Sequence, residues 1–157
     1  MKPSPNAYEV LMLAPFGAIG ICISDGLVSE IALIPPKLAV QAKTAEAASP
    51  AVTQIQAYLN NPNARLSFKC LHLGTPYQQR VWQAISQIPC GETRTYSELA
   101  QQIGSGPRAV ANACGANPLP LLIPCHRVVA KNGLGGFMQG VEGGLEIKKW
   151  LLAHESR

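Results

Sequence analysis

The sequence predicts an α+β fold built from two small domains, residues 1–72 and residues 73–157. Two observations predict this division. In the first half, runs of branched aliphatic residues flank an Asp25-Gly26 pair, which is the pattern of an antiparallel hairpin. The second half contains two helix-capping patterns and short helices separated by a glycine-containing turn, which indicates a helix-turn-helix.

The first half is predicted to be a small sheet with one helix. Ser49 followed by Pro50 is typical of a helix start, because serine caps the first turn and proline suits it, and this helix should end near Asn60. The alanine-rich stretch 37–48 is compatible with a weak helix or with a loop. We expect this half to be a scaffold. Strands are predicted at residues 8–13, 19–23, 27–34 and 65–71.

The second half begins with three predicted helices. Thr75 and Gln78 form a capping box ahead of an apolar helical stripe that ends near Ile88. Thr95 and Glu98 form a second capping box. The second helix is predicted to end before Gly104 and the third to span residues 108–115.

The rest of the second half is predicted to contain strands, a loop and a last helix. An apolar strand should lead into Cys125, and Asn132-Gly133 should form the tip of a hairpin that serves as a wing. The glycine-rich residues 134–144 are either a lid over a pocket or an ordinary surface loop. In the last helix, residues 145–155, Lys148 and Lys149 should lie on a charged outer face. Its inward residues by spacing are Ile147, Trp150, Leu151 and His154.

Composition excludes several classes of protein. No apolar run approaches the roughly 20 residues that span a bilayer, and the N-terminus lacks a secretory signal, so we expect a cytoplasmic protein without a membrane partner. The five cysteines include no CxxC pair and the three histidines do not cluster with them, so neither a disulfide scaffold nor a metal site is expected. The net charge of +4 is a weak hint of a polyanionic partner.

A thiol and an imidazole stand side by side at Cys125-His126, within residues 123–129. A free cysteine has a pKa near 8.5, so a basic partner within hydrogen-bond reach raises its thiolate fraction during reaction. Neighbouring Cys and His also occur by chance, and adjacent strand residues point to opposite faces. Read alone, the pair favours a chance occurrence, and the surrounding segments change this interpretation.

The helix at residues 108–115 has an unusual composition for a DNA-reading helix. It carries Arg108 and Asn112, and its other side chains are small. Such a helix permits close backbone approach to the minor groove, where little sequence information is available. A tightly packed core helix would show the same composition, so this alternative stays open.

Several segments of the second half carry a resemblance to a known family. The most specific is Pro124-Cys125-His126-Arg127, downstream of Asn117-Pro118. Over its last 85 residues or so, the chain resembles O6-alkylguanine-DNA alkyltransferase, also called methylated-DNA–protein-cysteine methyltransferase. The resemblance implies a small ribonuclease-H-like domain followed by a winged-helix domain. The matching segments are residues 74–82, 91–96, 108–110, 117–118, 123–129 and 149–155.

The resemblance also implies a chemistry and the residues that carry it. Cys125 would take a methyl or larger alkyl group from O6-alkylguanine in DNA, irreversibly and once per molecule, with O4-alkylthymine as a further candidate substrate. His126 would act as base through a water, with Glu155 orienting its ring. Asn117 would brace the active-site turn, and Tyr96 would assist nucleotide rotation and supply a proton. No cofactor is implied.

The implied partner is double-stranded DNA, bound through its minor groove with the damaged nucleotide flipped out of the duplex. The protein is expected to act as a monomer, and cooperative binding to DNA is left open. Arg108 would fill the gap left in the base stack. The residues expected to contact DNA are Arg94, Thr95, Arg108, Ala109, Ala111, Asn112, Ala113, Cys114, Gly115, Arg127 and Lys131. The residues expected to line the substrate pocket are Tyr96, Cys114, Pro120, Val128, Gly136, Phe137 and Met138.

Some positions depart from the family pattern. Cys114 and Gly115 stand where members often carry Met and Arg, and Phe137 replaces a frequent Tyr. Three other functions remain as alternatives: a non-catalytic lesion binder, a cysteine hydrolase and a winged-helix regulator. Thiol alkylation, turnover and DNA binding distinguish them, because Cys125 has a chemical role only in the alkyltransferase and the hydrolase.

Overall fold

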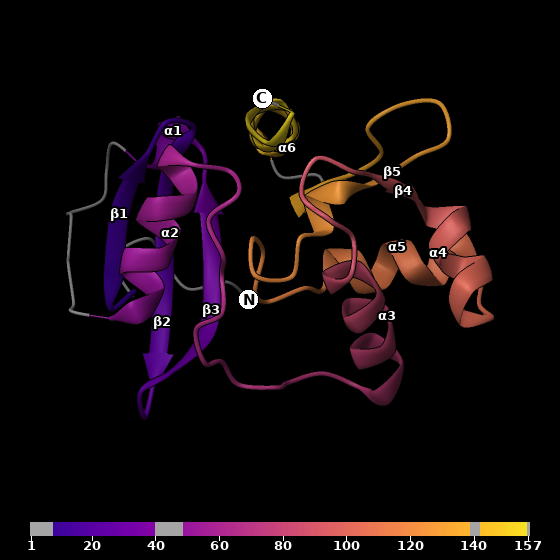
Figure 1. Cartoon of the computed structure of the whole chain (residues 1–157), viewed down its shortest axis with the longest axis horizontal. Coiled ribbons are helices and arrows are strands. Elements are labelled where there is room, and N and C mark those ends of the chain that lie inside the picture. Colours follow the sequence, from indigo (N-terminus) through magenta and orange to yellow (C-terminus); the bar gives the residue numbers. More distant parts are fainter. Residues whose placement is uncertain (1–7, 40–48, 139–141, 157) are drawn as a thin grey trace. The chain divides into compact units, whose positions relative to one another are not determined.

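The computed structural model describes residues 8–39, 49–138 and 142–156 (Figure 1). The chain divides into two compact units, with the boundary between Leu71 and His72. The first unit contains an antiparallel sheet and the second is mainly helical, so the predicted α+β class is confirmed. Within the described ranges, no helix is both long and apolar enough to cross a membrane.

The sheet of the first unit has three antiparallel strands in the order β1-β2-β3. The hairpin between the second and third strands turns at Asp25 and Gly26, whose φ angles of 52° and 79° are both left-handed. Left-handed residues at both central positions match the twist of the flanking strands, so the predicted hairpin is confirmed. The strands are β1 Val10–Ala14, β2 Gly17–Ser24 and β3 Leu27–Ile34.

Two helices follow the sheet, α1 Pro36–Ala39 and α2 Pro50–Asn60. The side chain of Ser49 accepts a hydrogen bond from the backbone N–H of Ala51 at 3.2 Å, which confirms the predicted cap of α2. Most of the stretch 37–48, left open between helix and loop, lies outside the described residues.

The strand predicted at residues 65–71 is wrong. Only an isolated parallel bridge joins Cys70 to Val28, supported by a 2.9 Å hydrogen bond from the N–H of Leu71 to the Val28 carbonyl. Earlier in the segment, the N–H of Ser67 donates to Oε1 of Gln54 on α2 at 2.6 Å. A side chain of the helix therefore takes a backbone donor that a strand ladder would have used.

In the second unit, both predicted capping boxes are confirmed. Thr75 and Gln78 exchange side-chain and backbone hydrogen bonds at the start of α3, Pro76–Ser86. Thr95 and Glu98 do the same at the start of α4, Tyr96–Ile103. Gly104, with φ 70°, ends α4 in the left-handed conformation. A third helix, α5 Pro107–Gly115, follows after a short turn.

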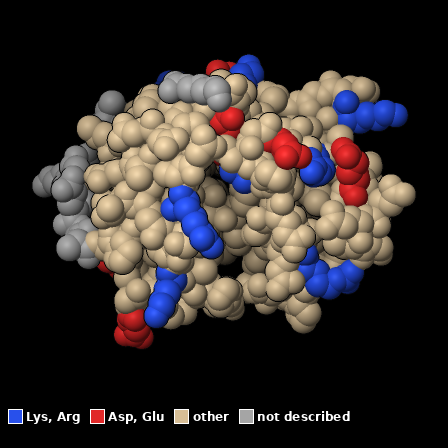
Figure 2. Space-filling view, viewed as in Figure 1, with Lys and Arg blue, Asp and Glu red and all other residues tan. Residues whose placement is uncertain are grey.

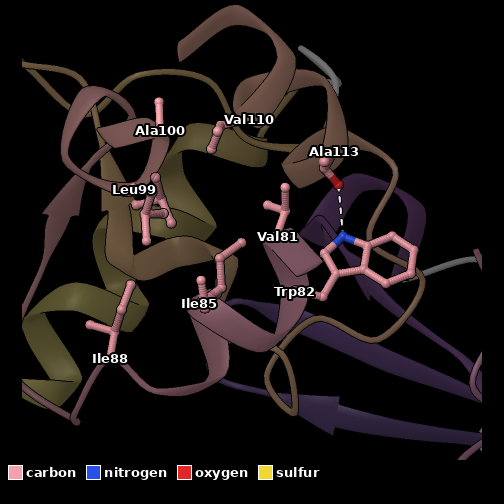
Figure 3. Close-up of a cluster of buried hydrophobic side chains, with 10 residues drawn as sticks. Val81, Trp82, Ile85, Ile88, Leu99, Ala100, Val110 and Ala113 are labelled. Atoms are coloured by element: carbon pink, nitrogen blue, oxygen red, sulfur yellow. Dashed lines mark hydrogen bonds between the residues drawn. The ribbon is translucent and has the colours of Figure 1, made fainter. Parts of the chain in front are cut away.

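The three helices share one apolar core, whose side chains are drawn in Figure 3. The indole Nε1 of Trp82 donates to the carbonyl of Ala113 at 2.9 Å, which joins α3 to the end of α5. This bond and the apolar packing hold α5 in place. The buried cluster is Val81, Trp82, Ala84, Ile85, Ile88, Leu99, Ala100, Val110, Ala113 and Val128.

The segment around Cys125 differs from the predicted strand and hairpin. Residues 119–124 form turns, and Cys125–Arg127 is a short 3-10 helix. The following strand, β5 Val128–Val129, pairs in parallel with β4 Arg94–Thr95 instead of with a hairpin partner. At the predicted hairpin only an isolated bridge joins Ala130 to Gly133. A prolyl ring at Pro124 removes a backbone donor, which disfavours a strand there.

The last helix, α6, spans Gly144–Glu155. Its predicted inward residues Ile147, Leu151 and His154 are buried, whereas Trp150 is only half-buried and stacks on the His154 ring with centroids 4.6 Å apart. The prediction for Lys148 is wrong, because this side chain is completely buried. The spacing of apolar residues predicted that Lys148 lies on the charged outer face. Hydrogen bonds from its ammonium group to buried carbonyls, described below, explain why it is buried instead.

Candidate active site

Cys125 lies at the start of the 3-10 helix with 7% of its surface exposed. The backbone before it is braced by Asn117, whose Nδ2 donates to the carbonyl of Ile123 at 2.9 Å. The Oδ1 of the same amide accepts from the N–H of Leu119 at 2.9 Å. Both ends of the Asn117 amide are therefore used to shape the turn that carries the thiol.

The imidazole next to the thiol is part of a buried ionic network. Nε2 of His126 lies 2.9 Å from Oε2 of Glu155, at the end of α6. Arg127 donates to the same carboxylate twice, from Nε to Oε1 at 2.8 Å and from Nη2 to Oε2 at 2.9 Å. Its Nη1 donates to the carbonyl of Ile88 at 2.7 Å. Glu155 thus holds both His126 and Arg127, two residues of the 3-10 helix, in position.

This network determines which form of His126 is present. Burial lowers the pKa of His126 below 6.5, against the smaller opposing effect of its hydrogen bond to Glu155. A neutral ring whose Nε2 faces a carboxylate carries its proton on Nε2. Nδ1 is then the basic nitrogen, which suits a general base at neutral pH.

A fully buried lysine contacts the loop that lines the cavity. Nζ of Lys148 donates to the carbonyls of Val128, Leu134 and Gly136 at 2.7, 2.5 and 3.0 Å. It also lies 5.8 Å from the centroid of the Phe137 ring. Burial lowers the pKa of Lys148 to about 8. The ammonium therefore ties α6 to β5 and to the loop that follows.

The thiol opens onto a cavity of about 280 Å³. Its walls come from the start of α4, the last turns of α5 and the loop 136–138. The lining residues are Tyr96, Ala111, Cys114, Gly115, Cys125, Gly136, Phe137 and Met138. Apolar and aromatic walls around a nucleophile are suited to a flat organic group such as a base.

Tyr96 stands between the cavity and the loop. Its hydroxyl donates to the carbonyl of Gly136 at 3.4 Å, and burial raises the pKa of Tyr96 to about 12. Close packing continues at Gly135, where φ is 74° and a Cβ would lie 2.8 Å from Cε2 of the tyrosine. The phenol therefore stays protonated at neutral pH and is held against the loop.

Five of the seven predicted pocket residues line the cavity, and two do not. Val128 is completely buried in the helical core, because its strand β5 packs against α3 and α5. Pro120 is half-buried in the turn region and is absent from the cavity walls. In their place the cavity is lined by Ala111 and Gly115, which the sequence had suggested only as DNA contacts.

Most residues predicted to contact DNA are accessible to solvent. Those that are exposed or half-buried are Arg94, Thr95, Arg108, Ala109, Ala111, Asn112, Cys114, Gly115 and Lys131. Two others differ from the prediction. Ala113 is 3% exposed and is packed in the core. Arg127 has 13% of its side chain exposed and its guanidinium is bonded to Glu155 and Ile88.

Figure 2 shows the Lys and Arg side chains of one face of the molecule, where they are scattered and not gathered in one patch. Arg94 is also paired with Glu92, at 3.1 Å. The pattern of charge in this view therefore does not by itself indicate a site for a polyanion.

Comparison with known proteins agrees with this geometry. The family model described as 6-O-methylguanine DNA methyltransferase, DNA binding domain, matches residues 76–157, which is more than half of the chain. This chain belongs to that methyltransferase family. A relative that aligns over nearly the whole chain is a methylated-DNA--protein-cysteine methyltransferase of Mycolicibacterium paratuberculosis. It is 35% identical over 150 residues, covering 92% of this chain and 89% of the relative.

Other members of the methyltransferase family match over shorter or equal spans. The probable methylated-DNA--protein-cysteine methyltransferase of Acanthamoeba polyphaga mimivirus is 57% identical over 86 residues, which is 54% of this chain and 55% of that protein. For this relative and for that of Salmonella typhimurium, at 47%, the chain spans about half the relative's length. The Mycobacterium tuberculosis O6-methylguanine methyltransferase has a TM-score of 0.77 at 31% identity, covering 93% of this chain and 90% of that one.

One feature of this methyltransferase family member was missed by sequence reasoning. Lys148 contacts the carbonyls of Val128, Leu134 and the cavity residue Gly136, whereas its position next to Lys149 suggested an exposed basic pair. The signal that was available is its place beside Ile147 on the buried stripe of α6. A lysine within an apolar stripe needs buried acceptors.

Proposed function

We propose that this chain repairs O6-alkylguanine in DNA by transferring the alkyl group to Sγ of Cys125. The observation that carries the proposal is the position of this thiol, on the wall of an apolar cavity and one residue from the buried His126–Glu155 pair. Membership of the methyltransferase family supports the same reaction, as do the names of the relatives. O4-alkylthymine is a second candidate substrate of the same site.

The first step is removal of the thiol proton. Nδ1 of His126 acts as the base through one bridging water, and Nε2 stays bonded to Glu155. Glu155 and Arg127 lie on the far side of the ring, where they fix its orientation and stabilise the positive charge that develops. His126 and Glu155 are positioning and proton-transfer groups, and Cys125 alone forms the covalent bond.

The second step is displacement at the alkyl carbon. The Cys125 thiolate forms an S–C bond as the C–O6 bond breaks, and the electron pair of that bond stays on the guanine. The restored base gains one proton, which the protonated hydroxyl of Tyr96 at the cavity wall is positioned to provide. The product is a thioether, which water does not cleave readily. One molecule therefore repairs one lesion.

The alkylated base must leave the duplex to reach this cavity. The small side chains of α5 permit close approach of its backbone to a minor groove, and Ala111 and Gly115 form the cavity wall on the same helix. Arg108 is exposed at the start of α5 and is proposed to occupy the space left by the flipped nucleotide.

A solved complex supports DNA as the partner. The Mycobacterium tuberculosis OGT structure in complex with DNA has a TM-score of 0.78 at 33% identity, covering 93% of this chain. Exposed side chains of α5 and its neighbours, with the cations Arg94 and Lys131, are proposed to contact the phosphates. Binding should therefore be largely independent of sequence and weaken with salt.

The test is intact-mass analysis after incubation with a duplex that contains O6-methylguanine. We expect the wild-type chain to gain one methyl group while an equal amount of lesion disappears, and we expect no gain for Cys125→Ser. Tight binding of the lesion without a mass change would instead identify a non-catalytic lesion binder. Repeated turnover by one molecule would contradict a stoichiometric thioether product.

A further inference from the structure

A second thiol lines the same cavity as Cys125. Cys114 is in the last turn of α5, which ends at Gly115, and it is half-buried. Both sulfur-bearing side chains belong to the wall of one space of about 280 Å³. None of the five cysteines, all of which lie in described segments, forms a disulfide.

Backbone hydrogen bonds bring the two cysteine segments together. The N–H of Asn117 donates to the carbonyl of Cys114 at 3.3 Å, and its side chain donates to the carbonyl of Ile123 at 2.9 Å. The N–H of Cys125 also donates to the Ile123 carbonyl, at 2.7 Å. One asparagine therefore links the residue on α5 to the turn that carries the nucleophile, although the cysteines are eleven positions apart in sequence.

Electrostatic effects agree with this proximity. Burial and then the charge of Cys125 raise the pKa of Cys114 to about 12. Burial is the main cause of the raised pKa of Tyr96 and of the lowered pKa of Lys148, and the charges of both thiols contribute to each of these pKa values. Tyr96 on the cavity wall and the buried Lys148 thus both interact with the two thiols, which indicates that the sulfurs share one neighbourhood.

We propose that Cys114 and Cys125 are a modification site in which a peroxide oxidises the pair to a disulfide. Cys125 reacts first, because it has the adjacent base, and Cys114 is the resolving thiol. A disulfide requires a Cα separation of about 4.4–6.8 Å, so its formation would hold the end of α5 and the turn that carries Cys125 within that range. This is a reaction of the protein alone and needs no DNA.

The reaction balances in two steps. The Cys125 thiolate attacks one oxygen of hydrogen peroxide, which forms a sulfenic acid and releases hydroxide. The sulfur of Cys114 then attacks the sulfenic sulfur, so that an S–S bond forms, the S–O bond breaks, and the oxygen leaves as water with the thiol proton. Peroxide is reduced to two water molecules overall and two thiols are oxidised.

The disulfide has a protective consequence that rests on the proposed function. A sulfenic acid left alone proceeds to sulfinic acid, which thiol reductants do not reverse, whereas a disulfide is reduced by thiols. The pair would therefore block alkyl acceptance during oxidation and restore it afterwards. Without Cys114, the same exposure would destroy the acceptor.

Peptide mapping of the full chain tests the disulfide directly. Trypsin cuts after Arg108 and Arg127, so one peptide, residues 109–127, carries both thiols and no other cysteine. After treatment with a small excess of peroxide and labelling with iodoacetamide, we expect this peptide to lose two hydrogen atoms and to take no label. Reduction with dithiothreitol before labelling should restore two labels.

Three variants distinguish the roles of the two thiols. Cys70→Ser removes a cysteine of the other unit and should behave like the wild type. Cys125→Ser should leave Cys114 labelled, because its high pKa makes it a poor first target of peroxide. In Cys114→Ser we expect added oxygen on Cys125, with reductive recovery of its labelling at least about tenfold lower than in the wild type.

Two results would overturn the proposal. One is a wild-type peptide in which Cys125 carries two or three oxygens while Cys114 remains labelled. The other is a disulfide that joins two chains or involves Cys22, Cys70 or Cys90 instead. The wild-type map does not depend on whether any variant folds. Because the peptide map measures a peptide mass, it is independent of the methyl-transfer assay. The disulfide proposal can therefore fail while the proposed function holds, and the reverse is also possible.

Discussion

Nζ of Lys148 lies 2.7 Å from the carbonyl oxygen of Val128, and the lysine is completely buried. The same ammonium also holds the carbonyls of Leu134 and Gly136. It therefore joins the last helix both to the strand after the nucleophile and to the loop that forms one wall of the cavity. Helix, strand and loop meet at one charged group, so its removal should affect both stability and reactivity.

Replacing Lys148 should lower both the stability of the protein and the rate of alkyl transfer. In Lys148→Met, three buried carbonyls lose their donor, and we expect the free energy of unfolding to fall by about 2–4 kcal/mol. Alkyl transfer should slow by about tenfold or more, because the loop wall is no longer held in place. Urea denaturation and single-turnover rates measure the two effects. The control is Lys149→Met, with a side chain 59% exposed, which should change stability by less than about 0.5 kcal/mol.

Stability should also depend on pH through Lys148. Its pKa is lowered from 10.5 to about 8 in the folded protein, so between these values the unfolded chain binds more protons than the folded one. The contribution of Lys148 to the free energy of unfolding therefore increases as pH rises from about 8 to 10.5. Subtracting the pH profile of Lys148→Met isolates it. A difference that is flat or falls with pH would contradict this prediction.

The carboxylate at the end of α6 should be essential in its ionised form. Glu155→Gln leaves one oxygen acceptor where three hydrogen bonds from Arg127 and His126 now end. We expect transfer to slow by about 10²-fold or more and stability to fall by about 3–5 kcal/mol. Glu146→Gln, in an exposed pair on the same helix, is the matched control and should behave like the wild type in both assays. Equal effects of the two substitutions would argue against a role for the buried network.

The acid limb of the rate profile should lie below the ordinary range of histidine. Burial lowers the pKa of His126 below 6.5, so the ring remains neutral, and able to accept a proton, under mildly acidic conditions. Single-turnover methyl transfer measured from pH 5 to 8 should reach half its plateau below pH 6.5. A midpoint above that value would mean that the carboxylate outweighs burial.

Two glycines near the cavity should tolerate alanine very differently. At Gly135, φ is 74° and a Cβ would press against the ring of Tyr96, so Gly135→Ala should lower stability by about 1–3 kcal/mol and slow transfer. Gly133 has open space around its Cα, and Gly133→Ala should lie within about 0.5 kcal/mol of the wild type. Thermal denaturation of both variants checks the contrast. Similar losses at both positions would show that the contact with Tyr96 is not the cause.

Local patterns predicted the helices of the second unit well. The capping boxes at Thr75 and Thr95 are confirmed because a cap and its partner lie within one turn, so neighbouring residues suffice to form them. The prediction of a turn at Asp25-Gly26 is confirmed for the same reason. By contrast, the strand at residues 65–71 failed, because a side chain from α2 takes one of its donors.

The sequence by itself determined the caps, the turn residues and the Cys125-His126 pair, because each depends on residues close together in the chain. Only the tertiary structure decided that Lys148 turns inward, that Arg127 is bonded to Glu155 and that Ala111 and Gly115 line the cavity. These are contacts between distant segments, and they depend on how helices pack. Burial and hydrogen bonding then determine the charge state of each group, so the chemistry of the site belongs to the folded chain.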